Sequence, residues 1–170
     1  MCIVIDADVF SYVINPNSSN HGDFRPVKDW IVSGKGKLVY GGTKYAEEIL
    51  GHQGFRGFLV QMEHKGKTVN VACGSVDKVE VDLKQNIKGS GFNDYHIVAI
   101  ILVSGCKLVC SNDQGLSNLI SVCYNRVARP LMKRVSKRVS IRWPIHRPII
   151  YKKQTHRVHL CDQNIAACCQ

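Results

Sequence analysis

The sequence lacks an apolar run long enough to cross a membrane, and it lacks the marks of an export signal. No uninterrupted apolar stretch approaches the roughly 18 residues that a membrane-spanning helix requires. The opening segment, MCIVIDADVF, has no basic residues and places Asp6 directly after an apolar run, which is unlike a secretory signal. We therefore expect a cytoplasmic protein without membrane segments.

The eight cysteines lack the regular spacing of a disulfide framework. Most of them lie in apolar segments, and a chain without an export signal keeps its thiols reduced. A group of possible zinc ligands does occur near the end of the sequence. Its members are His156, His159, Cys161, Cys168 and Cys169. Because the C-x₂₋₄-C pairs of structural zinc sites are absent, we interpret this group as packed, reduced side chains.

Acidic residues are absent from Gln114 to Leu160, whereas eleven Lys and Arg residues lie in the same stretch. The formal charge of the whole chain is +10. A basic stretch of this kind attracts phosphate-rich partners, although the same charges also suit a solvated surface without a partner. The candidate contacts to a nucleic-acid backbone are Arg126, Arg129, Lys133, Arg134, Lys137, Arg138 and Arg142.

Short apolar runs alternate with segments of helical periodicity along a chain of 170 residues, which suits one domain. The predicted strands lie at 2–5, 37–42, 68–74 and 106–112. Strands separated by helices are joined by right-handed crossovers, which predicts an α/β fold with a largely parallel sheet. We assign residues 1–125 to this domain and residues 126–170 to a basic, proline-containing extension packed on it.

The helical segments are bounded by turn formers and by residues that favour helix caps. The predicted helices lie at about 7–14, 24–34, 43–53, 55–62, 75–87, 94–104 and 115–125. A polar loop rich in turn formers is expected at 15–23. We expect Thr43 and Ser75 to cap the helices that they begin, because their hydroxyls can accept from free backbone N–H groups.

Four acidic residues can be brought together by this topology. Asp6 and Asp113 each follow a predicted strand, at the carboxyl ends where parallel sheets bind ligands. Glu48 lies in the helix after the second strand, and Asp94 begins the helix before the fourth. Clustered carboxylates repel one another unless a cation offsets them, and oxygen ligands suit Mg²⁺ or Mn²⁺. Taken singly, Asp94 and Asp113 suit the role of helix caps equally well.

Three segments of the chain follow a common pattern of strands, helices and acids: IVIDADVF, GGTKYAEEIL and NDYHIVAIILVSGCKLVCSNDQGL. Together they resemble the PIN-domain nucleases, and the resemblance covers roughly residues 2–122. It implies a compact three-layer α/β/α sandwich and metal-dependent hydrolysis of RNA. Asp6, Glu48, Asp94 and Asp113 would be the ligands of Mg²⁺ or Mn²⁺. The basic stretch, which lies outside the resemblance, would hold the RNA backbone.

The resemblance leaves the identity of the glutamate ligand to be chosen. Glu47 and Glu48 are adjacent, and either could be the glutamate that the family carries after a Ser or Thr. We choose Glu48, because the positions of Thr43 and Ile49 then agree best with the family pattern. Glu47 stays a secondary candidate. Without the resemblance, Glu48 would be interpreted as a solvent-facing glutamate beside Glu47.

The number of metal ions is also open. Many relatives carry another acid two residues after the last aspartate, where this chain has Gly115, so that one or two ions remain possible. Asp8 stands where many relatives have Asn or Ser, and we interpret it as an additional outer-sphere acid. Asn112 and Ser111 flank the last aspartate and would orient water at the ion.

The biological role is less specific than the chemistry. A short stand-alone domain of this kind resembles the toxin of a toxin–antitoxin pair, which requires a small inhibitory protein, and a defence or RNA-processing role stays open. The resemblance also suggests a homodimer. A non-catalytic RNA- or protein-binding module of the same fold is the main alternative.

A phosphatase is the less favoured alternative. The segment DADV also fits the D-x-D-x-[VT] start of haloacid dehalogenase-like phosphatases. Asp6 would then be the nucleophile and Asp8 the general acid or base. The acidic pair that this family carries later in the chain is missing from CSNDQGLSN.

Overall fold

A computed structural model describes residues 1–89, 91–123 and 149–151. Within them, five strands form one sheet in the order β3-β2-β1-β4-β5, and all neighbours are parallel. The strands are β1 (Cys2–Ile5), β2 (Lys37–Gly41), β3 (Thr68–Val71), β4 (Leu108–Cys110) and β5 (Ile149–Tyr151). The expected α/β fold with a parallel sheet is confirmed. The fifth strand comes from the segment that we separated as an extension.

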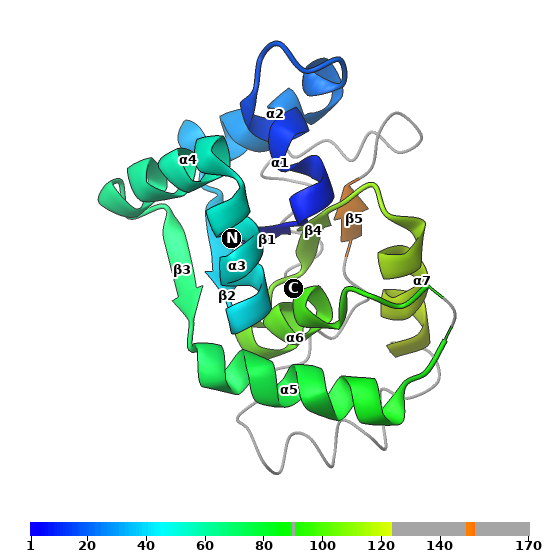
Figure 1. The fold of residues 1–170 in the computed structure, drawn as a ribbon. Coiled ribbons are helices and arrows are strands. Elements are labelled where there is room, and N and C mark those ends of the chain that lie inside the picture. The colour runs from blue at the N-terminus through cyan, green and yellow to red at the C-terminus, as the bar shows by residue number, and fades with distance from the viewer. Residues whose placement is uncertain (90, 124–148, 152–170) are drawn as a thin grey trace.

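Helices connect the strands and pack against the sheet (Figure 1). They are η1 (Ala7–Val9), α1 (Phe10–Ile14), α2 (His21–Val32), α3 (Thr43–Gly51), α4 (Gln53–His64), α5 (Cys73–Asn86), α6 (Tyr95–Ser104) and α7 (Gln114–Val122). In the view of Figure 1, α3 crosses in front of the sheet near β1 and β2, and α7 lies on the side of the sheet where β5 is the edge strand.

Helix α6 is buried on all sides. Every residue from Tyr95 to Leu102 is buried, and the helix contacts strands β1, β2 and β3 as well as α5. Its sequence, YHIVAIILVS, is apolar around most of the helix, as expected of a helix that has no solvent-facing side. None of the helices in the described part of the chain is both long enough and apolar enough to span a bilayer.

The order of the strands reverses beside β1. From β1 the chain passes to β2 and β3 on one side, and later returns to β4 and β5 on the other. Strands β1 and β4 are therefore neighbours at the point where the strand order reverses. In open parallel sheets, ligands bind outside the carboxyl ends of the strands at this point. Asp6 follows β1 directly, and Ser111 follows β4.

Several boundaries differ from those predicted. Helix α2 begins at His21, inside the predicted loop at 15–23. Strand β3 ends at Val71, and α5 begins at Cys73 with Ala72 at its N-cap position. The prediction that Ser75 caps this helix is therefore wrong, because the backbone N–H of Ser75 already donates to Ala72 O at 3.0 Å within the first turn.

Helix α3 is capped from another helix. The prediction that Thr43 is its N-cap is wrong: Gly42 occupies the N-cap position, with φ 84°, and Thr43 is the first helical residue. The backbone N and Oγ1 of Thr43 donate to the two carboxylate oxygens of Asp77 in α5, at 2.8 and 2.6 Å. Glycine is required at position 42, since a Cβ there would lie 2.6 Å from Cγ1 of Val76.

We predict that Asp77→Ala lowers the free energy of unfolding by about 1 kcal/mol, the usual effect of losing a side-chain cap. The loss arises because the N–H of Thr43 and its hydroxyl no longer have an acceptor. Urea denaturation measures it. The control is Asp82→Ala in the same helix, since the Asp82 side chain has no hydrogen bond within the described residues. Equal losses in the two variants would contradict the capping role.

Candidate functional site

Asp6 is held between the ends of two strands. Its backbone N–H donates to Cys110 O at 2.8 Å, which extends the ladder between β1 and β4 by one bond. Its Oδ2 accepts a hydrogen bond from Ser111 Oγ at 2.7 Å. Only 5% of Asp6 is exposed. Because burial disfavours the charged form of a carboxyl group, an aspartate in this place is unfavourable unless another group offsets its charge.

Ser111 links Asp6 to Asp113. The buried hydroxyl of Ser111 donates to Asp6 and accepts from the backbone N–H of Asp113 at 2.9 Å. Asp113 is the N-cap of α7, and its carboxylate accepts from the N–H groups of Gly115, at 3.0 Å, and Leu116, at 2.6 Å. Asp113 therefore is a helix cap, which is one of the two roles that the sequence left open.

There is a steric reason why this chain has glycine, and no acidic residue, two positions after Asp113. A Cβ at position 115 would lie 2.5 Å from the carbonyl oxygen of Gly91 and 2.9 Å from Oδ2 of Asp113. The first turn of α7 therefore packs directly on the backbone of the loop that leads to α6. A side chain at Gly115, such as the acid that the resemblance led us to look for, would require this backbone to move.

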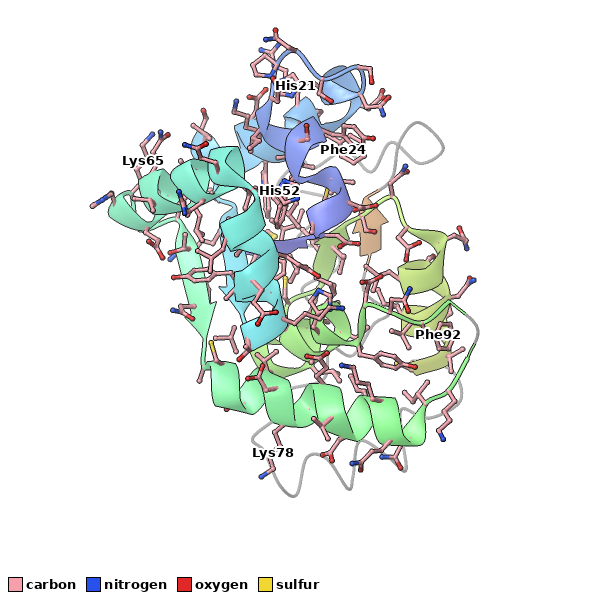
Figure 2. All side chains as sticks on the ribbon, in the orientation of Figure 1. His21, Phe24, His52, Lys65, Lys78 and Phe92 are labelled. Carbon is pink, nitrogen blue, oxygen red and sulfur yellow. The ribbon has the colours of Figure 1, made fainter. Side chains whose placement is uncertain are left out.

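Asp94 is not explained by helix capping. It occupies the N-cap position of α6, but its side chain makes no capping hydrogen bond. The loop before it is held by two contacts. Lys44 Nζ donates to Asn93 O at 3.0 Å, and the ring of Phe92 meets that of Tyr95 edge-on, with centroids 6.5 Å apart. Figure 2 shows Phe92 in this loop, between α5 and α6.

Glu48, rather than Glu47, faces the interior of the protein. Glu47 is exposed, whereas the Glu48 side chain is 26% exposed and its Oε2 lies 3.0 Å from Nε2 of His96. The neighbouring Tyr45 is fully buried, and its hydroxyl donates to the carbonyl oxygen of Ile5, the residue before Asp6. Helix α3 thus presents Glu48 next to the end of β1.

Burial and mutual repulsion raise the pKa values of three carboxyl groups. The pKa of Asp6 rises from 3.8 to about 6, because of burial and then the charge of Asp8. The pKa of Asp94 also rises to about 6, through burial and then the charge of Asp6. Loss of hydration, with the charges of Asp113 and Asp94, raises the pKa of Asp8. Asp6, Asp8, Asp94 and Asp113 thus form one electrostatic group, called the acidic cluster below.

Glu48 is connected to the acidic cluster through Tyr45. Burial raises the pKa of the Tyr45 hydroxyl well above its usual value, and the charges of Asp6 and Glu48 raise it further. Asp8 is joined to the end of β4 in a different way, since its Oδ2 accepts from the backbone N–H of Asn112 at 3.2 Å. All four predicted ligands, and the secondary candidates Asp8 and Asn112, therefore lie around the carboxyl ends of β1 and β4.

The acidic cluster is not a preassembled metal site. Among residues 1–89, 91–123 and 149–151, no three or more His, Cys, Asp or Glu side chains are arranged so that they could hold a metal ion. One existing contact helps to explain this, because both carboxylate oxygens of Asp113 accept hydrogen bonds from the first turn of α7. The candidate basic contacts, from Arg126 to Arg142, lie outside the described residues.

Two contacts at the site were missed from sequence: that of Lys44 with the loop before Asp94, and the pairing of His96 with Glu48. Ser111 was predicted at the site as a residue that orients water, but its bridge to Asp6 was not predicted. Each partner is remote in the chain, so local periodicity carries no signal for it. The one visible hint in the sequence is that a histidine, His96, stands directly before the apolar run IVAIILV.

Comparison of the chain with models of protein families, with curated proteins and with solved structures found no match. The resemblance of the sequence to PIN-domain nucleases therefore stays an expectation. The function has to be judged from the chemistry of the acidic cluster and its position at the reversal of strand order.

We predict that Asp6→Asn stabilises the metal-free protein at pH 7.5 by about 1–3 kcal/mol. A raised pKa means that the folded state binds the Asp6 proton more tightly than the unfolded state does. The contribution of this proton to the free energy of unfolding is therefore fully present below about pH 4, and it is lost as the pH rises through about 6. Asparagine has no proton to lose, and its amide oxygen still accepts from Ser111.

The measurement is urea denaturation of wild type and Asp6→Asn, from pH 4 to 8 with chelator present. The difference in free energy of unfolding should grow across pH 4 to 6 and then stay constant. Glu47→Gln removes an exposed carboxylate and controls for the loss of one negative charge. A difference that does not depend on pH would contradict the raised pKa of Asp6.

Proposed function

We propose that the chain is a metal-dependent ribonuclease with the three-layer α/β/α sandwich of the PIN-domain nucleases. The observation that carries this proposal is the acidic cluster, in which carboxyl groups from three separate segments lie close together, and burial and neighbouring negative charges raise the pKa values of Asp6, Asp8 and Asp94. The cluster lies at the edge where parallel sheets bind ligands. Self-repelling, partly buried carboxylates at such an edge are accounted for if they bind a cation.

The donor set fits a hard divalent cation. It consists of carboxylate oxygens, which suit Mg²⁺ and Mn²⁺ better than they suit softer metals. The residues that would hold the ion are Asp6, Glu48, Asp94 and Asp113. Asp8 would act from outside this set, through its charge. When bound, the ion supplies Lewis-acid activation of water and offsets negative charge on a phosphodiester.

Other groups of the chain would hold these carboxylates in place. Ser111 fixes Asp6 by donating to its Oδ2, and the same hydroxyl accepts from the N–H of Asp113. Lys44 fixes the loop before Asp94, and its positive charge lowers the pKa of the Asp94 carboxyl against the larger effect of burial. The positive charge of Lys44 beside the acidic cluster also suits a substrate that carries phosphate groups.

RNA is the proposed substrate, and the basic stretch is the proposed contact to its backbone. The Lys and Arg residues between Arg126 and Arg157 give this stretch a high positive charge without any acidic residue. Binding that depends on phosphate contacts releases counterions, so that the affinity for RNA should fall steeply as salt is added. The basic stretch would bring the polyanion to the cluster, and the cluster would carry the chemistry.

The test is cleavage of a structured RNA and of a single-stranded DNA of matching sequence by the full chain. Each reaction is run with Mn²⁺, with Mg²⁺ and with chelator. We predict that only RNA is cut, that cleavage needs the metal, and that Asp94→Asn reduces the rate about 100-fold or more, as when a group that stabilises a transition state is removed. The fold should survive, because the Asp94 side chain makes no capping hydrogen bond.

The matched control is Asp82→Asn, which removes a carboxylate from α5 that is not part of the cluster. Its cleavage rate should equal that of wild type. Full activity in Asp94→Asn would remove Asp94 from the site and contradict the proposal. Binding of RNA without cleavage at every divalent ion would instead place the chain among non-catalytic RNA-binding modules.

A further inference from the structure

His96 is a buried imidazole in the apolar helix α6. Only 1% of the residue is exposed, and its ring centroid lies 6.3 Å from that of Tyr45. Its Nε2 lies 3.0 Å from Oε2 of Glu48 in α3. Its Nδ1 is buried and has no hydrogen-bond partner among the described residues. Within the described part of the chain, the polar contact of this ring is therefore its pairing with Glu48.

Packing alone does not account for a histidine at this position. A buried polar atom without a partner costs about 1–3 kcal/mol, whereas an apolar side chain of similar size fills the same space without that cost. The seven residues that follow His96, from Ile97 to Val103, are all apolar. The exception at His96 is explained by what its Nε2 does. Because a carboxylate only accepts, Nε2 carries the ring proton, and this N–H donates a hydrogen bond to Oε2 of Glu48.

We propose that His96 is a positioning residue that sets the orientation of the Glu48 carboxylate for binding a divalent cation. This inference rests on the proposed function. Asp94 lies at the N-cap of α6 and His96 two residues later, so one buried helix carries one proposed ligand and orients another that comes from α3. Hydrogen bonds from outside the ligand set commonly orient metal ligands, and losing one typically lowers metal affinity 10–100-fold.

The test is a titration of the metal-free full chain with Mn²⁺, in which electron paramagnetic resonance measures the unbound ion. His96→Leu should weaken Mn²⁺ binding about 10–100-fold. It should leave the free energy of unfolding unchanged or raise it, because a buried nitrogen without a partner is removed. A purely structural histidine would show the opposite pattern, with lost stability and unchanged affinity.

Two amide variants control for the possibility that the leucine variant loses affinity because it disturbs the packing. His96→Gln places an N–H donor near the position of Nε2 and should restore affinity to within a few fold of wild type. His96→Asn has a shorter side chain that does not reach Glu48 and should bind Mn²⁺ as weakly as His96→Leu does. Equal affinities in the Gln and Asn variants would overturn the positioning role.

A double-mutant cycle separates this inference from the proposed function. In a Glu48→Gln background, adding His96→Leu should cause no further loss of Mn²⁺ affinity, because His96 acts through Glu48. An additional loss in that background would overturn the inference. A second result would also overturn the inference: His96→Leu binds Mn²⁺ as tightly as wild type, whereas Glu48→Gln binds it weakly. This result would leave the proposed metal site in place. Failure of the wild-type chain to bind Mn²⁺ would overturn the proposed function itself.

Discussion

The pairing of β1 with β4 is the constraint on which the site depends. The backbone bond from Asp6 to Cys110 and the side-chain bond from Ser111 to Asp6 continue this pairing beyond the strand ends. Ser111 and Asp6 are 105 residues apart in the chain, so only the reversal of strand order brings them together. Once these ends are adjacent, the acids that follow each strand become neighbours. The acidic cluster is thus a consequence of topology.

The same closeness makes the cluster unfavourable in the unliganded protein. Burial and repulsion keep the carboxyl groups of Asp6 and Asp94 partly protonated at pH values where a free aspartate is fully charged. The surrounding hydrogen bonds limit this cost, since Ser111 binds Asp6 and the N–H groups of α7 bind Asp113. Proteins tolerate such local cost at functional sites, which is why we assign the cluster to chemistry.

The sequence was informative where residues act locally. The apolar runs of β1 and β2 and the alternation with helices predicted the parallel sheet. Asp6 directly after β1 and Asp113 three residues after β4 indicated where the site lies. Contacts between distant segments were not predictable in this way. Thr43 is bound by Asp77, 34 residues away, and Glu48 by His96, 48 residues away. Periodicity reports that a side chain is buried, but it does not report which partner buries it.

The most direct test is to locate Mn²⁺ by its anomalous scattering in crystals of the full chain soaked with the ion. We expect a peak bound by the carboxylates of Asp6, Glu48, Asp94 and Asp113. At least one Asp113 oxygen should have left the N–H groups of α7 to bind the ion. A well-ordered cluster without a peak, with Asp113 still capping α7 through both oxygens, would contradict the claim that these carboxylates form a metal site.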